Sequence, residues 1–81
     1  MEIAVQCFGP ARQLAGADVV MLELPDAATV GDAVDALASG HDELASLLPS
    51  CAIAVADEIV TRSHPLRAGD EVAVLPPVAG G

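Results

Sequence analysis

Lysine, tyrosine and tryptophan are absent from this sequence of 81 residues, and Phe8 is its only aromatic residue. Its three arginines stand against twelve acidic residues, which gives a formal net charge of −9. Nucleic acids and anionic membrane surfaces attract basic proteins, so this charge argues against both as partners. It fits a protein partner with a basic docking surface, because opposite charge speeds the encounter of two proteins.

Signals of membrane and secreted proteins are missing as well. No apolar run approaches the roughly 18 residues that would suggest a membrane-spanning helix. The start of the chain has no basic segment of the kind found in signal peptides. Cys7 and Cys51 are far apart and have neither CxxC nor zinc-site spacing. We therefore expect reduced thiols in the core of a cytoplasmic protein.

No motif for catalysis or metal binding is present. His41 is followed by two acidic residues, but three successive residues cannot all face one ion from a helix, so we interpret them as a solvated helix start. His64 lies in a loop without a partner in the sequence. Cys7 or Cys51 could act as a nucleophile only if the fold brought a base beside it. We expect no active site built from the chain's own side chains.

Capping signals predict one main helix and two short ones. Thr29 and Asp32 resemble a capping box, apolar residues then follow helical spacing, and Gly40 supplies a stop. Shorter helices are predicted over Ala11–Ala15, after Pro10 and before Gly16, and over Glu43–Leu48, ended by Pro49.

Alternating apolar residues predict strands over Glu2–Phe8, Val19–Leu24, Cys51–Ala56, Ile59–Thr61 and Asp70–Leu75. A tight turn is predicted at Asp57–Glu58, and residues 63–69 form a loop. In the first strand Ile3, Val5 and Cys7 should face the core and Phe8 should face outward. The pattern indicates an α+β domain, with a mixed sheet of about five strands packed on the main helix plus short helices.

The last residues predict a tail. Pro76 and Pro77 end the final strand because neither can donate a ladder hydrogen bond. The predicted division is a domain over residues 1–75 and a flexible tail over residues 76–81, which spans roughly 20 Å when extended. After the prolines the tail contains only small or apolar residues: Val78, Ala79, Gly80 and Gly81. Glycines without side chains would let a terminal carboxylate enter a narrow slot in a partner.

Strand parity also predicts an exposed apolar patch near the start of this tail. It places Phe8 and Leu75 on the outer side of the sheet, and Ile59 lies beside them if the short strand closes the same sheet. Apolar residues that face water there suggest a docking surface. The alternative is that Phe8 folds under a loop.

The sequence resembles one known family over nearly its whole length. The matching segments are His64-Pro65-Leu66, the run Gly69–Ala73, Pro76-Pro77-Val78 and the terminal Gly80-Gly81. By these segments it is similar to the small, sulfur-carrying subunit of molybdopterin synthase. The resemblance implies a ubiquitin-like β-grasp fold, in which the first and last strands are central, parallel neighbours.

The resemblance also implies a chemistry that acts on Gly81. A ubiquitin-activating-like adenylyltransferase would use ATP and magnesium to adenylate its carboxylate, and a sulfur donor protein would convert it to a thiocarboxylate. The loaded tail would then give sulfur to cyclic pyranopterin monophosphate in the large catalytic subunit, with two carriers used per product in a heterotetramer. No cofactor bound tightly to the carrier itself is implied.

Three further residues enter through the same resemblance. Phe8, Ile59 and Leu75 align with apolar contact positions of the family. Leu75 stands where an aromatic residue is common, and Ala56 stands where many relatives have Asn before a turn. The first departure would weaken docking, and the second would loosen the turn.

Three other functions are compatible with the sequence. A sulfur carrier for thiamine thiazole synthesis shares the expected fold and ending, but its chains are usually shorter and lack the two prolines. A ubiquitin-like modifier would join Gly81 to a lysine of a target protein. A plain binding module would have an inert tail.

Overall fold

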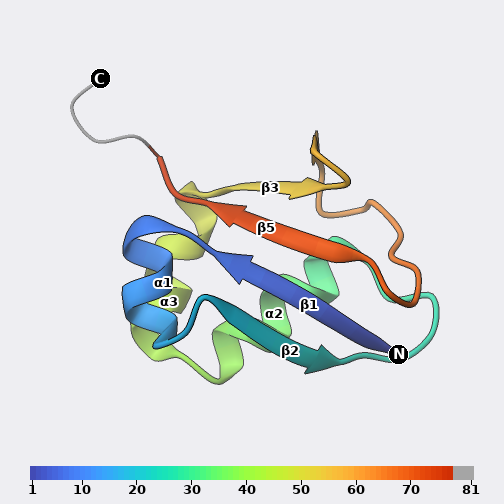
Figure 1. The fold of residues 1–81 in the computed structure, drawn as a ribbon, viewed down its shortest axis with the longest axis horizontal. Helices are drawn as coiled ribbons and strands as arrows, with labels where there is room; N and C mark the ends of the chain where they lie inside the picture. Colours follow the sequence, from blue (N-terminus) through green and yellow to red (C-terminus); the bar gives the residue numbers. More distant parts are fainter. Residues whose placement is uncertain (78–81) are drawn as a thin grey trace.

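The computed structural model describes residues 1–77, which form one sheet with the helices on one of its sides (Figure 1). The elements in chain order are β1 (Glu2–Cys7), α1 (Gly9–Ala15), β2 (Val19–Glu23), α2 (Val30–Ser39), α3 (Asp42–Leu47), the 3₁₀ turn η1 (Leu48–Ser50), β3 (Ala52–Val55), β4 (Glu58–Val60) and β5 (Glu71–Leu75). Within residues 1–77, no helix has the length and apolar character that crossing a bilayer requires.

The five strands are ordered β2-β1-β5-β3-β4 across the sheet. β1 pairs antiparallel with β2 and parallel with β5, while β3 lies antiparallel between β5 and β4. The first and last strands are therefore parallel neighbours inside the sheet, as the resemblance implied. A parallel pair needs a long crossover, and here the chain between β1 and β5 supplies it. The α+β prediction and the mixed sheet are confirmed.

The core lies between this sheet and the helices. In β1 the side chains of Ile3, Val5 and Cys7 are at most 2% exposed, and in β5 Val72 and Val74 are 1% exposed. The main helix adds its own apolar stripe: Val30, Ala33, Val34 and Leu37. Burial of one aliphatic side chain contributes roughly 1.5–3 kcal/mol. Because the only aromatic residue lies outside this core, the fold depends on many such small contributions.

The start of α2 is capped as the sequence predicts. The backbone N–H of Asp32 donates to Thr29 Oγ1 at 3.3 Å, and the N–H of Thr29 donates to Asp32 Oδ2 at 2.8 Å, which completes a capping box. Gly40 follows the last helical residue. Local capping chemistry therefore sets both ends of this helix.

The loop before β5 is fastened to the same helix start. The carbonyl of His64 accepts the N–H of Val30 at 2.9 Å, and the carbonyl of Arg62 accepts the N–H of Gly31 at 2.8 Å. A Cβ at Gly31 would lie 3.2 Å from the Arg62 carbonyl oxygen, so a residue without a side chain suits this close approach. These bonds hold the loop where β5 must begin.

Pro49 does not end the second short helix as predicted. α3 already ends at Leu47, and Pro49 lies within the 3₁₀ turn that continues it. Proline fits there because its missing N–H falls in the first turn of η1, where no intrahelical partner is required. Leu44 and Leu48 are buried in the core, and the half-buried Leu47 packs against it.

The hairpin between β3 and β4 turns one residue earlier than predicted. Val55 pairs with Glu58, so the turn residues are Ala56 and Asp57, not Asp57 and Glu58. Both have positive φ values, 53° and 65°. A two-residue turn with this geometry matches the right-handed twist of the strands, and periodicity alone could not locate it to the residue. The other strand ends agree with the predictions to within one residue.

Replacement of Ala56 by asparagine should stabilise the protein. An alanine held at positive φ costs roughly 1–2 kcal/mol, and asparagine tolerates this conformation better. We expect Ala56→Asn to raise the free energy of unfolding by about 1 kcal/mol, measured by urea denaturation with an unchanged m value. Ala68→Asn is the matched control, because Ala68 is exposed in a turn without positive φ. An equal gain in both variants would contradict the explanation.

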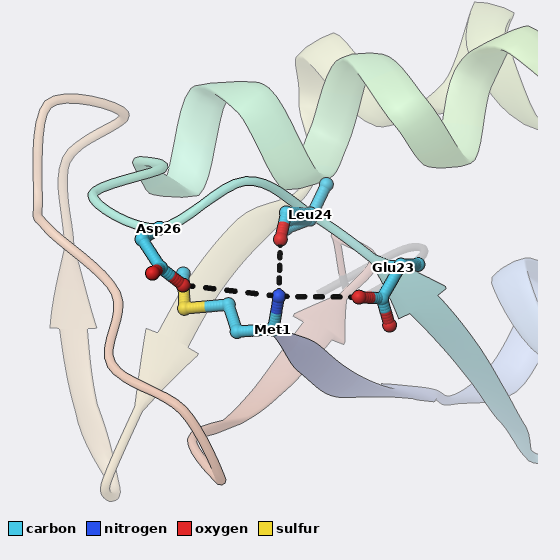
Figure 2. A network of polar contacts seen from close by, with 4 residues as sticks. All are labelled: Met1, Glu23, Leu24 and Asp26. Carbon is cyan, nitrogen blue, oxygen red and sulfur yellow. Dashed lines mark hydrogen bonds and ion pairs between the residues drawn. The ribbon is translucent and has the colours of Figure 1, made fainter.

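The amino end of β1 is fixed to the end of β2 (Figure 2). The Met1 ammonium donates to the carbonyl of Leu24 and pairs with Glu23 Oε1 at 3.3 Å and Asp26 Oδ1 at 4.0 Å. The N–H of Leu24 returns a hydrogen bond to the carbonyl of Met1 at 2.8 Å. Met1 and Leu24 thus form one more hydrogen-bonded pair of the β1–β2 ladder.

Candidate functional site

The candidate site lies where β1 and β5 finish side by side. These strands are parallel, and Cys7 at the end of β1 lies opposite Val74. β5 ends one residue later at Leu75, and Pro76 and Pro77 follow outside any regular element. Neither proline can donate a ladder hydrogen bond, so the chain leaves the sheet at this point. The exit therefore lies beside the junction between β1 and α1.

Most of the predicted tail lies outside the described residues. Pro76 is half-buried and Pro77 is exposed. Gly81, predicted to carry the sulfur, lies outside residues 1–77, as do Val78, Ala79 and Gly80. The division between a domain over 1–75 and a tail over 76–81 stays a prediction.

Phe8 stands at the β1–α1 junction and is exposed. Its extended backbone and the positive φ of Gly9, 53°, turn the chain from the strand into the helix. The carbonyl of Phe8 accepts the N–H of Ala11 at 3.1 Å. The Phe8 side chain is 46% exposed, so it does not fold under a loop. α1 begins at Gly9, before the predicted Ala11, because Pro10 fits the first helical turn.

The sheet surface turned away from the helices is here called the open face (Figure 1). Strand alternation brings the predicted patch residues toward it. Leu75 alternates with buried Val74 and is half-buried on this face. Ile59 on the edge strand β4 is 65% exposed and lies opposite Ala54, which faces Ala73 on β5. Phe8, Leu75 and Ile59 thus lie toward the open face, although β3 separates Ile59 from β5.

Two exposed apolar residues of the open face were not included in the predicted patch. Val19 is 46% and Met21 is 55% exposed, and both belong to β2. Both alternate with the half-buried Val20 and Leu22, which places them on the side away from the core. The strand order is needed to show that they lie on the same face of the sheet as Phe8.

A shallow depression of about 260 Å³ lies on the open face. It forms where the short side chains of Ala54 and Ala73 lie opposite each other. Gln6 Nε2 donates to Glu71 Oε2 at 3.3 Å along its border. Its described lining holds no cysteine, histidine, serine or lysine.

The two thiols of the described residues both lie near backbone carbonyls. Both cysteines are free; Cys7 Sγ–H points to the Val5 carbonyl at 4.0 Å, and Cys51 Sγ–H donates to the Leu47 carbonyl at 3.4 Å. Burial raises the pKa of the Cys7 thiol, with a further rise from the charge of Cys51, and burial also raises the pKa of Cys51. Both thiols are therefore poor nucleophiles at neutral pH. The described residues contain no cluster of metal ligands.

The chain is similar to known proteins over its whole length. The ThiS family model matches residues 5–81. The molybdopterin synthase sulfur carrier subunit of Chlamydomonas reinhardtii is 35% identical over 83 residues, which cover 100% of both chains. The crystal structure of SAMP1 from Haloferax volcanii superposes with a TM-score of 0.92 at 30% identity and 100% coverage of both chains. This similarity confirms the ubiquitin-like β-grasp fold.

A complex of two different subunits is also among the similar structures. It is the protein–protein complex of subunits 1 and 2 of the molybdopterin-converting factor from Helicobacter pylori. One chain of it superposes on the present chain with a TM-score of 0.73 at 28% identity, with 100% of both chains covered.

Proposed function

This chain belongs to the ThiS family, and from that premise we propose that it is the sulfur carrier subunit of a molybdopterin synthase. The main support is its match to a sulfur carrier subunit, which covers 100% of both chains. The fold adds support, because β5 delivers the chain to one end of the sheet and the prolines release it there.

The reactive group of the proposed carrier is the main-chain carboxylate of Gly81. A carboxylate is a poor electrophile. A partner of the ubiquitin-activating type would transfer AMP from ATP to it with the help of magnesium, and pyrophosphate would leave. A sulfur donor protein would then supply sulfur, the bond to AMP would break, and Gly81 would end as a thiocarboxylate. ATP and magnesium belong to the partner, and the carrier holds no cofactor of its own.

The segment 76–81 would then act as the arm that presents this group. Pro76 and Pro77 restrict the start of the arm, because proline fixes φ and proline-rich segments are semi-rigid. Gly80 and Gly81 have no side chains, so the end of the arm can enter a narrow channel. The domain over residues 1–75 would anchor the arm and take no part in the chemistry.

The large catalytic subunit is the proposed recipient of the sulfur. The Helicobacter complex supports a partnership with a second subunit. Phe8, Ile59 and Leu75 would dock against that subunit through the open face, while the tail reaches cyclic pyranopterin monophosphate in its active site. A product with two new sulfur atoms needs two loaded carriers, which fits a heterotetramer. Free Cys7 and Cys51 fit the reducing conditions of the cytoplasm.

A second candidate function is protein modification. SAMP1 of Haloferax volcanii is a small archaeal modifier protein by name, and its structure superposes over the whole chain. In that function the adenylated Gly81 would be attacked by a lysine amine of a target, and an amide would form as AMP leaves. The two functions share the activation step and differ in the nucleophile that follows it.

Intact-mass spectrometry tests the proposal. The full chain is incubated with its candidate adenylyltransferase, ATP, magnesium and a sulfur source. We expect a mass gain that corresponds to exchange of one oxygen for sulfur, and transfer of that sulfur once the large subunit and the pterin are added. An unchanged mass would contradict the sulfur carrier, and an unchanged mass together with no amide to added target proteins would contradict both functions. An amide to target proteins without any sulfur gain would favour the modifier.

A further inference from the structure

The outer edge of β2 is a free strand edge among the described residues. β2 is the terminal strand of the sheet, and within residues 1–77 it pairs only with β1 (Figure 1). The direction of its backbone groups follows from the ladder. Met1 and Leu24 exchange hydrogen bonds at one end, and the N–H of Cys7 donates to the Asp18 carbonyl at 2.8 Å at the other.

Alternation along the antiparallel ladder then assigns the intervening residues. Residues 18, 20, 22 and 24 direct their N–H and C=O groups toward β1. The residues between them, Val19, Met21 and Glu23, direct these groups outward, away from the sheet. The backbone groups of these three residues have no partner among the hydrogen bonds of the described part of the chain beyond the ladders.

The outward residues also have exposed side chains. Val19 and Met21 are 46% and 55% exposed, and the Glu23 side chain is 77% exposed. Proteins usually protect such an edge with lysine, proline, a bulge or a short strand. β2 contains no lysine and no proline, and its register with β1 runs without interruption from Val19 to Glu23. The opposite edge strand, β4, is only three residues long.

Charge indicates what kind of strand fits this edge. Asp18 and Glu23 lie at its two ends with side chains 75% and 77% exposed. Glu2 lies directly opposite Glu23 on β1, so carboxylates outnumber the local cations at that end, where Met1 supplies the only ammonium. At the other end Arg12 Nε pairs with Asp18 at 2.9 Å. The edge thus combines an apolar middle with a net acidic end at Glu23, while Arg12 balances the charge of Asp18 at the other end.

A second copy of this chain fits poorly. Antiparallel self-pairing centred on Met21 would bring Glu23 of each copy opposite Val19 of the other and join two chains of net charge −9. A basic strand would gain from the same charges.

We propose that the β2 edge is a docking site for an extended segment of a partner protein, which adds to the sheet as a sixth strand. The segment has alternating apolar side chains, which contact Val19 and Met21, and a basic residue near the end that lies beside Glu23. Its backbone pairs with the outward groups of β2. This site lies at the far edge of the sheet from Ile59 and uses neither the tail nor the proposed sulfur chemistry.

A synthetic peptide tests this site on the full chain. The probe is capped at both ends, alternates valine and threonine, and has a lysine at each end. In ¹⁵N-labelled protein we expect the largest amide shifts, and slower hydrogen exchange, at Val19, Met21 and Glu23. Met21→Pro removes an outward N–H without loss of a ladder bond, and should weaken peptide binding about tenfold.

Controls separate the edge from other effects. Ile59→Pro removes an outward N–H from the opposite edge and should leave peptide binding unchanged. Glu23→Lys keeps the backbone and should weaken binding several-fold at low salt, which preserves the test if Met21→Pro does not fold. The proposal is overturned by no binding, by shifts centred on Phe8 or β4, by equal losses in the two proline variants, or by a dimer of the chain across β2.

Discussion

A chain that lacks Gly81 should show no sulfur gain in the intact-mass assay, although it folds as well as the full chain. Deletion still leaves a glycine carboxylate, now on Gly80, so the chemical group is unchanged. The position of the carboxylate does change, because one extended residue spans about 3.3 Å. A displacement of about 1 Å can cost a hundredfold in rate when reacting groups must align. We therefore expect at least a hundredfold loss of thiocarboxylate formation.

The truncated chain should be as stable as the full chain, so the loss of thiocarboxylate formation would not result from unfolding. The core is built from residues between Ile3 and Val74, and the hydrogen bonds of the sheet end with β5. Thermal unfolding of the truncated chain should match that of the full chain. A chain extended by one alanine after Gly81 should fail in the same way, while Ala79→Ser keeps the length and should be loaded. Normal loading of the truncated chain would show that Gly81 is not the acceptor.

Local signals made the helices and the core predictable from the sequence. Thr29, Asp32 and Gly40 define the main helix through contacts within a few residues, and the structure has the expected capping box. Parity in β1 correctly assigned Ile3 and Val5 to the core. Such features depend on neighbours in the chain, so a sequence contains them directly.

Features that depend on strand order were not accessible in the same way. The parallel pairing of β1 with β5 joins residues that are far apart in the chain, and it was expected only from a family resemblance. The turn at Ala56 and Asp57 was placed one residue late, because its position depends on the register of β3 with β4. Val19 and Met21 alternate with half-buried neighbours, but their place on a free edge follows only from the full sheet.

Loss of the Phe8 side chain should weaken docking of the proposed large subunit far more than it weakens folding. Phe8 is 46% exposed and lies outside the buried core, so Phe8→Ala removes little packing. Aromatic anchors at the centre of interfaces commonly contribute about 2 kcal/mol or more, which corresponds to roughly thirtyfold in affinity. We expect a loss of that size by calorimetric titration with the large subunit, and a nearly unchanged melting temperature.

Met21→Ala is the matched control for this prediction. Met21 is 55% exposed on the open face, but it belongs to β2, on the other side of β1 from the exit of the tail at Leu75. If the subunit docks around that exit, Met21→Ala should change its affinity little, and Leu75→Phe should increase it by restoring an aromatic contact. Equal losses of affinity for Phe8→Ala and Met21→Ala would mean that the binding energy is spread over the whole open face and is not concentrated around Phe8. If Phe8→Ala lowered the free energy of unfolding as much as the free energy of binding, Phe8 would be a structural residue. Loss of an interface anchor should weaken the complex more than it destabilises the free carrier.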